Sequence, residues 1–174
     1  MKDLWKLNGH EITNLLNKKK VSATEICNNL IEHIEKINPK INAIVVKTYE
    51  DAKKQAKVLD KKIKDHEKIG LLAGVPTTIK VNTDQIGYPS TNGLQIQKDL
   101  IATQDSPVVK NLRNSDALMF GKTNTPAFSI HWFTRNSLHG HTLNPHNKNI
   151  TPGGSSGGAA AATATGMSAI GHGT

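Results

Sequence analysis

The stretch Gly153-Gly154-Ser155-Ser156-Gly157-Gly158 is followed at once by AAAATATG at residues 159–166. Glycine lets the backbone approach a ligand closely, and the first N–H groups of a helix have no partner within the helix. A helix start that also carries two hydroxyl groups suits a carbonyl oxygen or another anion. The stretch therefore predicts a catalytic site where a loop meets a helix.

Two other interpretations of this stretch fit less well. A flexible linker is also rich in glycine and serine, but Thr151-Pro152 stand before this one and helix-forming alanines follow it. A phosphate-binding P-loop needs lysine after its last glycine, whereas Ala159 follows Gly158 here. No dinucleotide fingerprint occurs in a strand-to-helix context. We therefore expect no cofactor.

Composition limits the class of protein. A chain of 174 residues is long enough for one domain with a substantial core. No apolar run reaches the roughly 18 residues of a membrane span, and the N-terminus lacks the apolar stretch of a signal peptide. The single cysteine, Cys27, excludes an internal disulfide bond and is typical of a reducing compartment. We expect a cytoplasmic protein with no membrane partner.

The net charge of +8 raises the question of nucleic-acid binding. Among the 22 lysine and arginine residues, only Arg113 and Arg135 are arginines, whereas phosphate and base contacts favour arginine. The lysines before Gly70 are interleaved with acidic residues, as on a solvated helix face. We expect no nucleic-acid partner.

The chain changes character near Gly70. Residues 1–69 contain one glycine and show helical spacing of their apolar residues. Ser22 and Glu25 have the spacing of a capping box that opens a helix, and Asn38-Pro39 predict its end. Residues 1–69 are therefore interpreted as the N-terminal helical segment of the domain.

Residues 70–174 alternate short apolar strands with helix starts. Strands are predicted at residues 77–82 and 117–120, and Ser106-Pro107 predicts a helix between them. This alternation is typical of an α/β fold. Residues 70–174 are interpreted as an α/β core, and the fold class as α/β.

Several familiar kinds of site find no support in the residues. A nucleophile elbow matches the serine stretch literally, but its triad needs an acid later in the chain, and no Asp or Glu follows Asp116. Glycosidase chemistry needs two carboxylates, and the absence of Asp and Glu after Asp116 leaves few carboxylates that could serve it. His139, His141 and His146 lie in a loop rich in Gly, Asn and Pro, where solvent-facing histidines are common, so we expect no metal site.

Lys80 is a stronger candidate for chemistry. It lies between Ile79 and Val81 in a predicted strand. Burial lowers the pKa of an ammonium group and makes a neutral amine available as a base. The alternative is a surface lysine on an edge strand.

Four motifs occur in order along the chain: GVPTTIKVN at residues 74–82, GKTN at 121–124, NP at 144–145 and PGGSSGG at 152–158. Together they resemble the amidase signature family, and the resemblance covers nearly the whole chain. It implies the N-terminal part of that family's fold, a mixed sheet covered by helices. It also implies hydrolysis of a small-molecule amide by a Ser-cisSer-Lys triad.

The resemblance assigns roles to individual residues. Lys80 matches the catalytic lysine, held neutral as the base, and Ser155 matches the relay serine that follows a cis peptide bond. The turn that Gly153 and Gly154 help to form supports this serine. Ser156 is expected to support Lys80 by hydrogen bonding.

The resemblance places the nucleophilic serine roughly two dozen residues beyond the relay serine. The sequence ends at Thr174, short of that position, so we expect a truncated amidase core that is inactive alone. The oxyanion donors beside that serine would be missing too. Candidate protein partners are a second copy of the chain and a complementing C-terminal fragment.

Two alternatives stay open. One is a non-enzymatic remnant or interaction module. The other is the A-type subunit of a glutamyl-tRNA amidotransferase, although residues 132–140 are more similar to general amidases. Val81, Thr125 and Ala127 depart from common family residues, which affects the subfamily more than the family.

Overall fold

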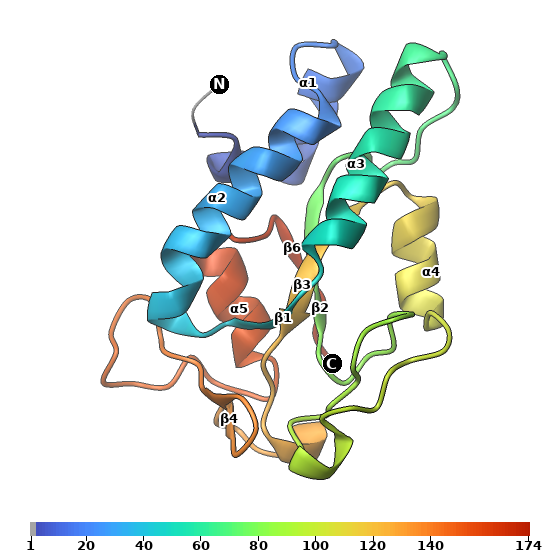
Figure 1. The fold of residues 1–174 in the computed structure, drawn as a ribbon. Coiled ribbons are helices and arrows are strands. Elements are labelled where there is room, and N and C mark those ends of the chain that lie inside the picture. Colours follow the sequence, from blue (N-terminus) through green and yellow to red (C-terminus); the bar gives the residue numbers. More distant parts are fainter. Residues whose placement is uncertain (1–2) are drawn as a thin grey trace.

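The computed structural model describes residues 3–174, and Figure 1 shows the arrangement of their elements. In chain order these are η1 (Leu4–Lys6), α1 (Gly9–Asn17), α2 (Ala23–Ile41), β1 (Ile44–Lys47), α3 (Tyr49–Lys64), β2 (Pro76–Lys80), η2 (Gln95–Gln97), α4 (Pro107–Asn114), β3 (Leu118–Thr123), η3 (Ala127–Ser129), β4 (Arg135–Asn136), β5 (Gly140–His141), α5 (Gly157–Ala164) and β6 (Ile170–Gly171). The predicted α/β class is confirmed.

The main sheet is mixed and has the strand order β1-β3-β2-β6. β1 runs antiparallel to β3, whereas β2 is parallel to both β3 and β6. The register between β2 and β3 shifts once: Thr77 pairs with Met119, but Thr78 pairs with Gly121, so Phe120 is an extra residue. Such an extra residue is a β-bulge.

Helices cover both faces of this sheet (Figure 1). Leu118 and Phe120 belong to the larger core cluster, together with apolar residues of α1, α2, α3 and α5. Met119 points the other way and packs with Ile79 and Val109, which brings α4 onto the second face. The two clusters follow from the alternation of side chains along a strand.

Local signals explain where the helices begin. The predicted capping box is present at α2, where Ser22 accepts from the Glu25 N–H and the Glu25 side chain accepts from the Ser22 N–H. A second box, unnoticed in the sequence, opens α1 through Asn8 and Glu11. Each box satisfies two backbone donors that the helix itself leaves unpaired.

Some predicted boundaries are wrong: the strands expected at residues 77–82 and 117–120 are β2 at 76–80 and β3 at 118–123, and the end of α2 also differs. α2 does not end at Asn38-Pro39 but continues to Ile41, where Asn42 adopts a left-handed conformation. Pro39 has no N–H to donate within the helix, and only Lys40 and Ile41 follow it in α2. The buried side chain of Asn38 then stabilises the exit, because it accepts from the N–H groups of Ala43 and Ile44.

Cys27 is buried in α2, and burial raises the pKa of its thiol to about 11. It therefore packs as a small apolar residue, as expected. Within residues 3–174, the helices are all too short or too polar to cross a bilayer.

Candidate active site

The serine stretch forms a tight turn that leads into α5. Gly153 has a φ of +85°, which favours glycine. The peptide bond between Gly154 and Ser155 is cis. α5 then begins at Gly157, as predicted for a loop that opens a helix.

Close packing explains one more glycine of this turn. A Cβ atom on Gly158 would lie 2.5 Å from the backbone nitrogen of Asn124 and 2.6 Å from its carbonyl oxygen. These are backbone atoms that cannot rotate away, so only glycine fits without moving the chain. Gly158 thereby brings the start of α5 against the segment that follows β3.

Lys80 ends β2 and is fully buried, so the alternative of a surface lysine is wrong. Its Nζ lies 2.8 Å from Ser155 Oγ and 2.9 Å from Thr174 Oγ1, within hydrogen-bonding distance of both. Burial lowers the pKa of Lys80. The structure thus brings together the two residues for which the sequence suggested chemistry, a lysine that gives up its proton readily and a hydroxyl group beside it.

Ser156 does not support Lys80 in the way expected. Its Oγ donates to the carbonyl oxygen of Thr174 and accepts from the Thr174 N–H, each at 3.2 Å. Thr174 Oγ1 in turn accepts from Lys80. The reason is geometric: Ser155 faces Lys80, while Ser156 faces the segment that follows β6. Ser156 therefore acts on Lys80 through Thr174.

Two threonines hold the turn in place, and sequence reasoning missed both. Thr125 Oγ1 donates to the carbonyl oxygen of Ser155 at 3.2 Å. Thr134 Oγ1 donates to the carbonyl oxygen of Gly153 at 2.8 Å and accepts from the Gly157 N–H at 3.0 Å. Both lie in the segment between β3 and β5, 30 and 19 residues before their partners in the turn. No pattern of neighbouring residues therefore indicates the contact.

His172 is a further group near the lysine. Burial lowers the pKa of its ring, and the positive charge of Lys80 lowers it further. Its backbone N–H donates to the carbonyl oxygen of Thr78, which extends the pairing of β6 with β2. His172 therefore favours its neutral form beside Lys80.

The other histidines differ from one another. His141 and His146 are exposed, as expected for a polar loop, but His139 is not: its Nε2 lies 2.8 Å from Thr91 Oγ1, and burial lowers its pKa. No group of three or more His, Cys, Asp or Glu side chains could hold a metal ion anywhere in residues 3–174.

Comparison with known proteins adds a second line of evidence to this geometry. The family model described as Amidase matches residues 25–174. The chain belongs to the amidase signature family. This match confirms the resemblance seen in the motifs around Lys80 and Ser155.

Individual relatives agree with the family match. The chain is 43% identical over 170 residues to indoleacetamide hydrolase of Bradyrhizobium diazoefficiens, covering 98% of this chain and 32% of the relative. It is 40% identical to the A-type subunit of glutamyl-tRNA(Gln) amidotransferase from Fusobacterium nucleatum, covering 93% of this chain and 33% of that protein. Among solved structures, a bacterial aryl acylamidase of the amidase signature family superposes with a TM-score of 0.90 and 37% identity, over 94% of this chain and 34% of the other.

The chain spans about a third of the length of the relatives it matches. The fold is accordingly the N-terminal part of the amidase signature fold, with the mixed sheet and covering helices that the resemblance implied.

Proposed function

We propose that this chain provides the lysine and the relay serine of an amide hydrolase. Lys80 is the base and Ser155 carries the proton between it and a nucleophilic serine. The observation that carries the proposal is the 2.8 Å contact between Lys80 Nζ and Ser155 Oγ, in a place where burial lowers the pKa of the lysine.

The reaction follows from this contact. Neutral Lys80 takes the proton of the Ser155 hydroxyl, while Ser155 Oγ takes the proton of the nucleophilic serine. That serine attacks the amide carbonyl, the amine leaves with a proton, and water then hydrolyses the acyl-enzyme. Thr174 Oγ1 orients Lys80, and Thr125 holds the carbonyl oxygen of Ser155, so both atoms of the relay keep their positions.

Among the described residues, the last serine after the relay serine, Ser168, is a poor candidate for the nucleophile. It is buried, and its Oγ lies 3.2 Å from Thr78 Oγ1 and 3.3 Å from Thr163 Oγ1. We propose that the nucleophilic serine comes from a further segment, such as a complementing C-terminal fragment, and that residues 1–174 are inactive without it. Residues 1–69 and 70–174 would then be two segments of one incomplete domain, in the cytoplasm, whose substrate is a small-molecule amide.

A chimera tests this proposal. Residues 1–174 would replace the matching part of the Bradyrhizobium indoleacetamide hydrolase, and ammonia release from indoleacetamide would be measured. We expect activity in the chimera and none in residues 1–174 alone. Lys80→Met and Ser155→Ala should each lower kcat by about 10²–10⁴-fold, the range of general acid–base catalysis.

The control is Lys53→Met, which alters an exposed lysine of α3. It should leave activity unchanged. A chimera that unfolds cooperatively but keeps its activity after Lys80→Met would refute the role of Lys80. Labelling of Ser155 by an acylating serine probe in residues 1–174 alone would refute the relay role.

A second candidate function has support from the similarity to the A-type subunit of glutamyl-tRNA(Gln) amidotransferase. Under this alternative, the site would hydrolyse an amide only together with tRNA and a partner subunit. Activity of the chimera that needs tRNA and such a partner would favour it over hydrolysis alone.

A further inference from the structure

A pocket of about 320 Å³ is formed by the β4–β5 hairpin and the loop at residues 143–151. Neither Lys80 nor Ser155 contributes to its lining. Pockets for drug-sized ligands have about 300–1,000 Å³. This pocket is at the lower end of that range, so it suits a molecule of about one ring with one polar group.

The charged residues that line this pocket have the same sign. Arg135 and Lys148 belong to the lining, which in the described part of the chain contains no Asp or Glu. No acidic residue follows Asp116 in the sequence, so the segment that forms the pocket cannot neutralise these charges itself. Two positive charges without a carboxylate beside them favour an anionic occupant.

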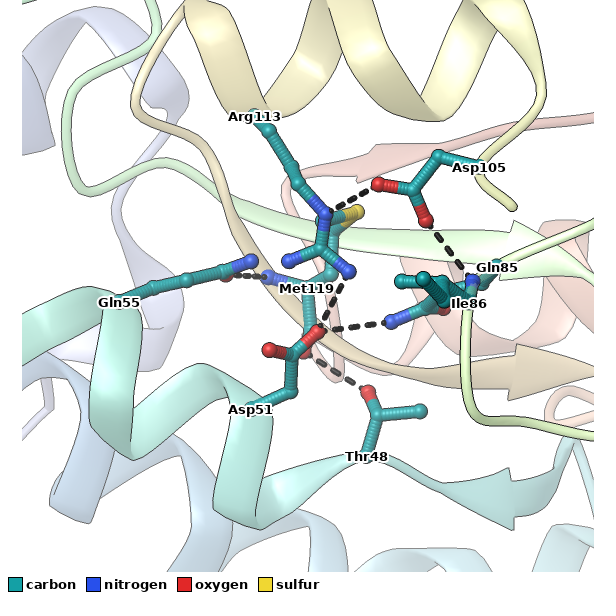
Figure 2. A network of polar contacts seen from close by, with 8 residues as sticks. All are labelled: Thr48, Asp51, Gln55, Gln85, Ile86, Asp105, Arg113 and Met119. Carbon is teal, nitrogen blue, oxygen red and sulfur yellow. Dashed lines mark hydrogen bonds and ion pairs between the residues drawn. The ribbon is translucent and has the colours of Figure 1, made fainter. Parts of the chain in front are cut away.

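The two arginines of the chain differ in their partners. Figure 2 shows the guanidinium group of Arg113 between Asp105 and Asp51, to which it donates at 2.7 and 2.8 Å. Arg135 is exposed in β4, and within residues 3–174 its side chain has neither an ion pair nor a hydrogen bond. The five N–H donors of its guanidinium group are therefore available to a ligand.

Further donors line the same pocket. His141 lies directly opposite Arg135 in the hairpin, so both side chains are on one face of it, and a neutral imidazole still offers one N–H. Thr151 Oγ1 accepts from the Gly153 N–H at 3.0 Å, which leaves its own O–H free to donate. Arg135, His141, Lys148 and Thr151 are all exposed, so a ligand can reach them from solvent.

The loop that carries Lys148 has its own hydrogen bonds. Asn144 Nδ2 donates to the carbonyl oxygen of Thr151 at 3.1 Å, which joins the two ends of the loop. Asn144 Oδ1 accepts from the His146 N–H at 2.9 Å, and Asn147 Oδ1 accepts from the Asn149 N–H at 2.9 Å. The backbone on both sides of Lys148 is thereby held beside the hairpin.

The apolar part of the lining comes from Phe133, Leu143 and Ile150. We propose that this pocket binds a small phosphate monoester with an apolar body, of the size of phenyl phosphate. Such a phosphate carries a charge of about −1.5 to −2 at pH 7, which matches the two positive charges better than a carboxylate does. The guanidinium fork of Arg135 donates to two phosphate oxygens, Lys148 donates to the same group, and the ring lies against the apolar side chains.

Calorimetric titration of this chain with phenyl phosphate, inorganic phosphate and benzoate tests the proposal. Low ionic strength is used because salt screens exposed charges. We expect one saturable site for phenyl phosphate. Benzoate lacks the second charge and inorganic phosphate lacks the ring, so each should bind at least about threefold more weakly. Failure of phenyl phosphate to bind would overturn the site.

The two weaker probes refute separate parts of the proposal. Benzoate that binds as tightly as phenyl phosphate would overturn the phosphate, and inorganic phosphate that does so would overturn the apolar body. Binding is measured in this chain alone, so the result does not depend on the proposed catalysis.

The matched variants are Arg135→Gln and Lys148→Gln, each of which removes one exposed positive charge of the pocket. Both should unfold as cooperatively as the wild type. Arg135→Gln should lower the affinity for phenyl phosphate at least about tenfold, and Lys148→Gln should lower it as well.

Lys57→Gln is the control, because it changes the net charge equally but alters an exposed lysine of α3 outside the pocket. It should bind phenyl phosphate as the wild type does. Unchanged affinity in Arg135→Gln would overturn the assignment, and an equal loss in Lys57→Gln would show that only the net charge of the chain attracts the anion.

Discussion

Replacement of Lys122 by methionine should remove a pH dependence from the stability of this fold. Lys122 is fully buried in β3, and its Nζ donates to the carbonyl oxygen of Pro89 at 2.6 Å and to Ser90 Oγ at 3.2 Å. Burial lowers its pKa to about 8, and the charge of Asp84 opposes this shift only in part. Methionine has a similar length and no charge to titrate.

The direction in which stability changes with pH follows from the number of protons that the folded and unfolded states bind. An unfolded lysine has a pKa of about 10.4. Between about pH 8 and that value, the unfolded chain holds a proton that folded Lys122 has released, so stability rises with pH. Each pH unit corresponds to about 1.4 kcal/mol, which gives a total of about 3 kcal/mol. Lys80, whose pKa is also lowered, adds a change of the same sign in both proteins, so it cancels in the comparison.

Urea unfolding of the wild type and Lys122→Met at about pH 7.5 and about pH 10 measures this effect. We expect the unfolding free energy of the wild type, relative to that of Lys122→Met, to be about 2–3 kcal/mol higher at about pH 10 than at about pH 7.5. The exposed-lysine variant Lys57→Met should show no such change. A difference for Lys122→Met that does not depend on pH would refute the inference that folded Lys122 releases its proton first.

Three further substitutions test individual contacts of the fold, each by the free energy of unfolding. Gly158→Ala should cost about 1–3 kcal/mol because its Cβ meets the backbone of Asn124, and an unchanged midpoint would contradict the close approach. Asn136→Asp should cost about 1–3 kcal/mol, since it keeps the acceptor but loses the donor to Asn124 Oδ1; a loss no greater than for an exposed Asn→Asp change would argue against this bond. Asp60→Ala should cost about 1–3 kcal/mol because the carboxylate accepts from the N–H and the hydroxyl of Thr24 at the start of α2, and a variant as stable as the wild type would show that Ser22 alone caps that helix.

Much of the fold could be predicted because its signals are local. The Ser22 capping box, the strand that ends at Lys80 and the glycine-rich start of α5 each depend on residues close together in the sequence. The predicted catalytic residues Lys80 and Ser155 came instead from the order of the motifs along the chain and the family resemblance that they carry, and the structure places Ser155 beside Lys80.

The rest of the site depends on contacts between distant segments. Thr134 holds the turn from 19 residues away, and Thr174 contacts Lys80 across 94 residues. Both are threonines, a residue type that occurs at many other positions of the chain. Only the sheet and α5 bring these segments together, so the part of Ser156 in orienting Lys80 through Thr174 could not be predicted from residue types.

The extra residue in β3 separates two positive charges. With Phe120 bulged, Lys122 pairs with Ile79 and Lys80 pairs with Thr123. If the register of the first two pairs continued unshifted, Lys80 would instead pair directly with Lys122. Both ammonium groups would then lie on one face of the sheet, where each would oppose the charge of the other. The single inserted residue thus keeps the two ammonium groups out of direct pairing. The pKa of the candidate catalytic lysine can then be set by the groups around Lys80 rather than by the charge of Lys122.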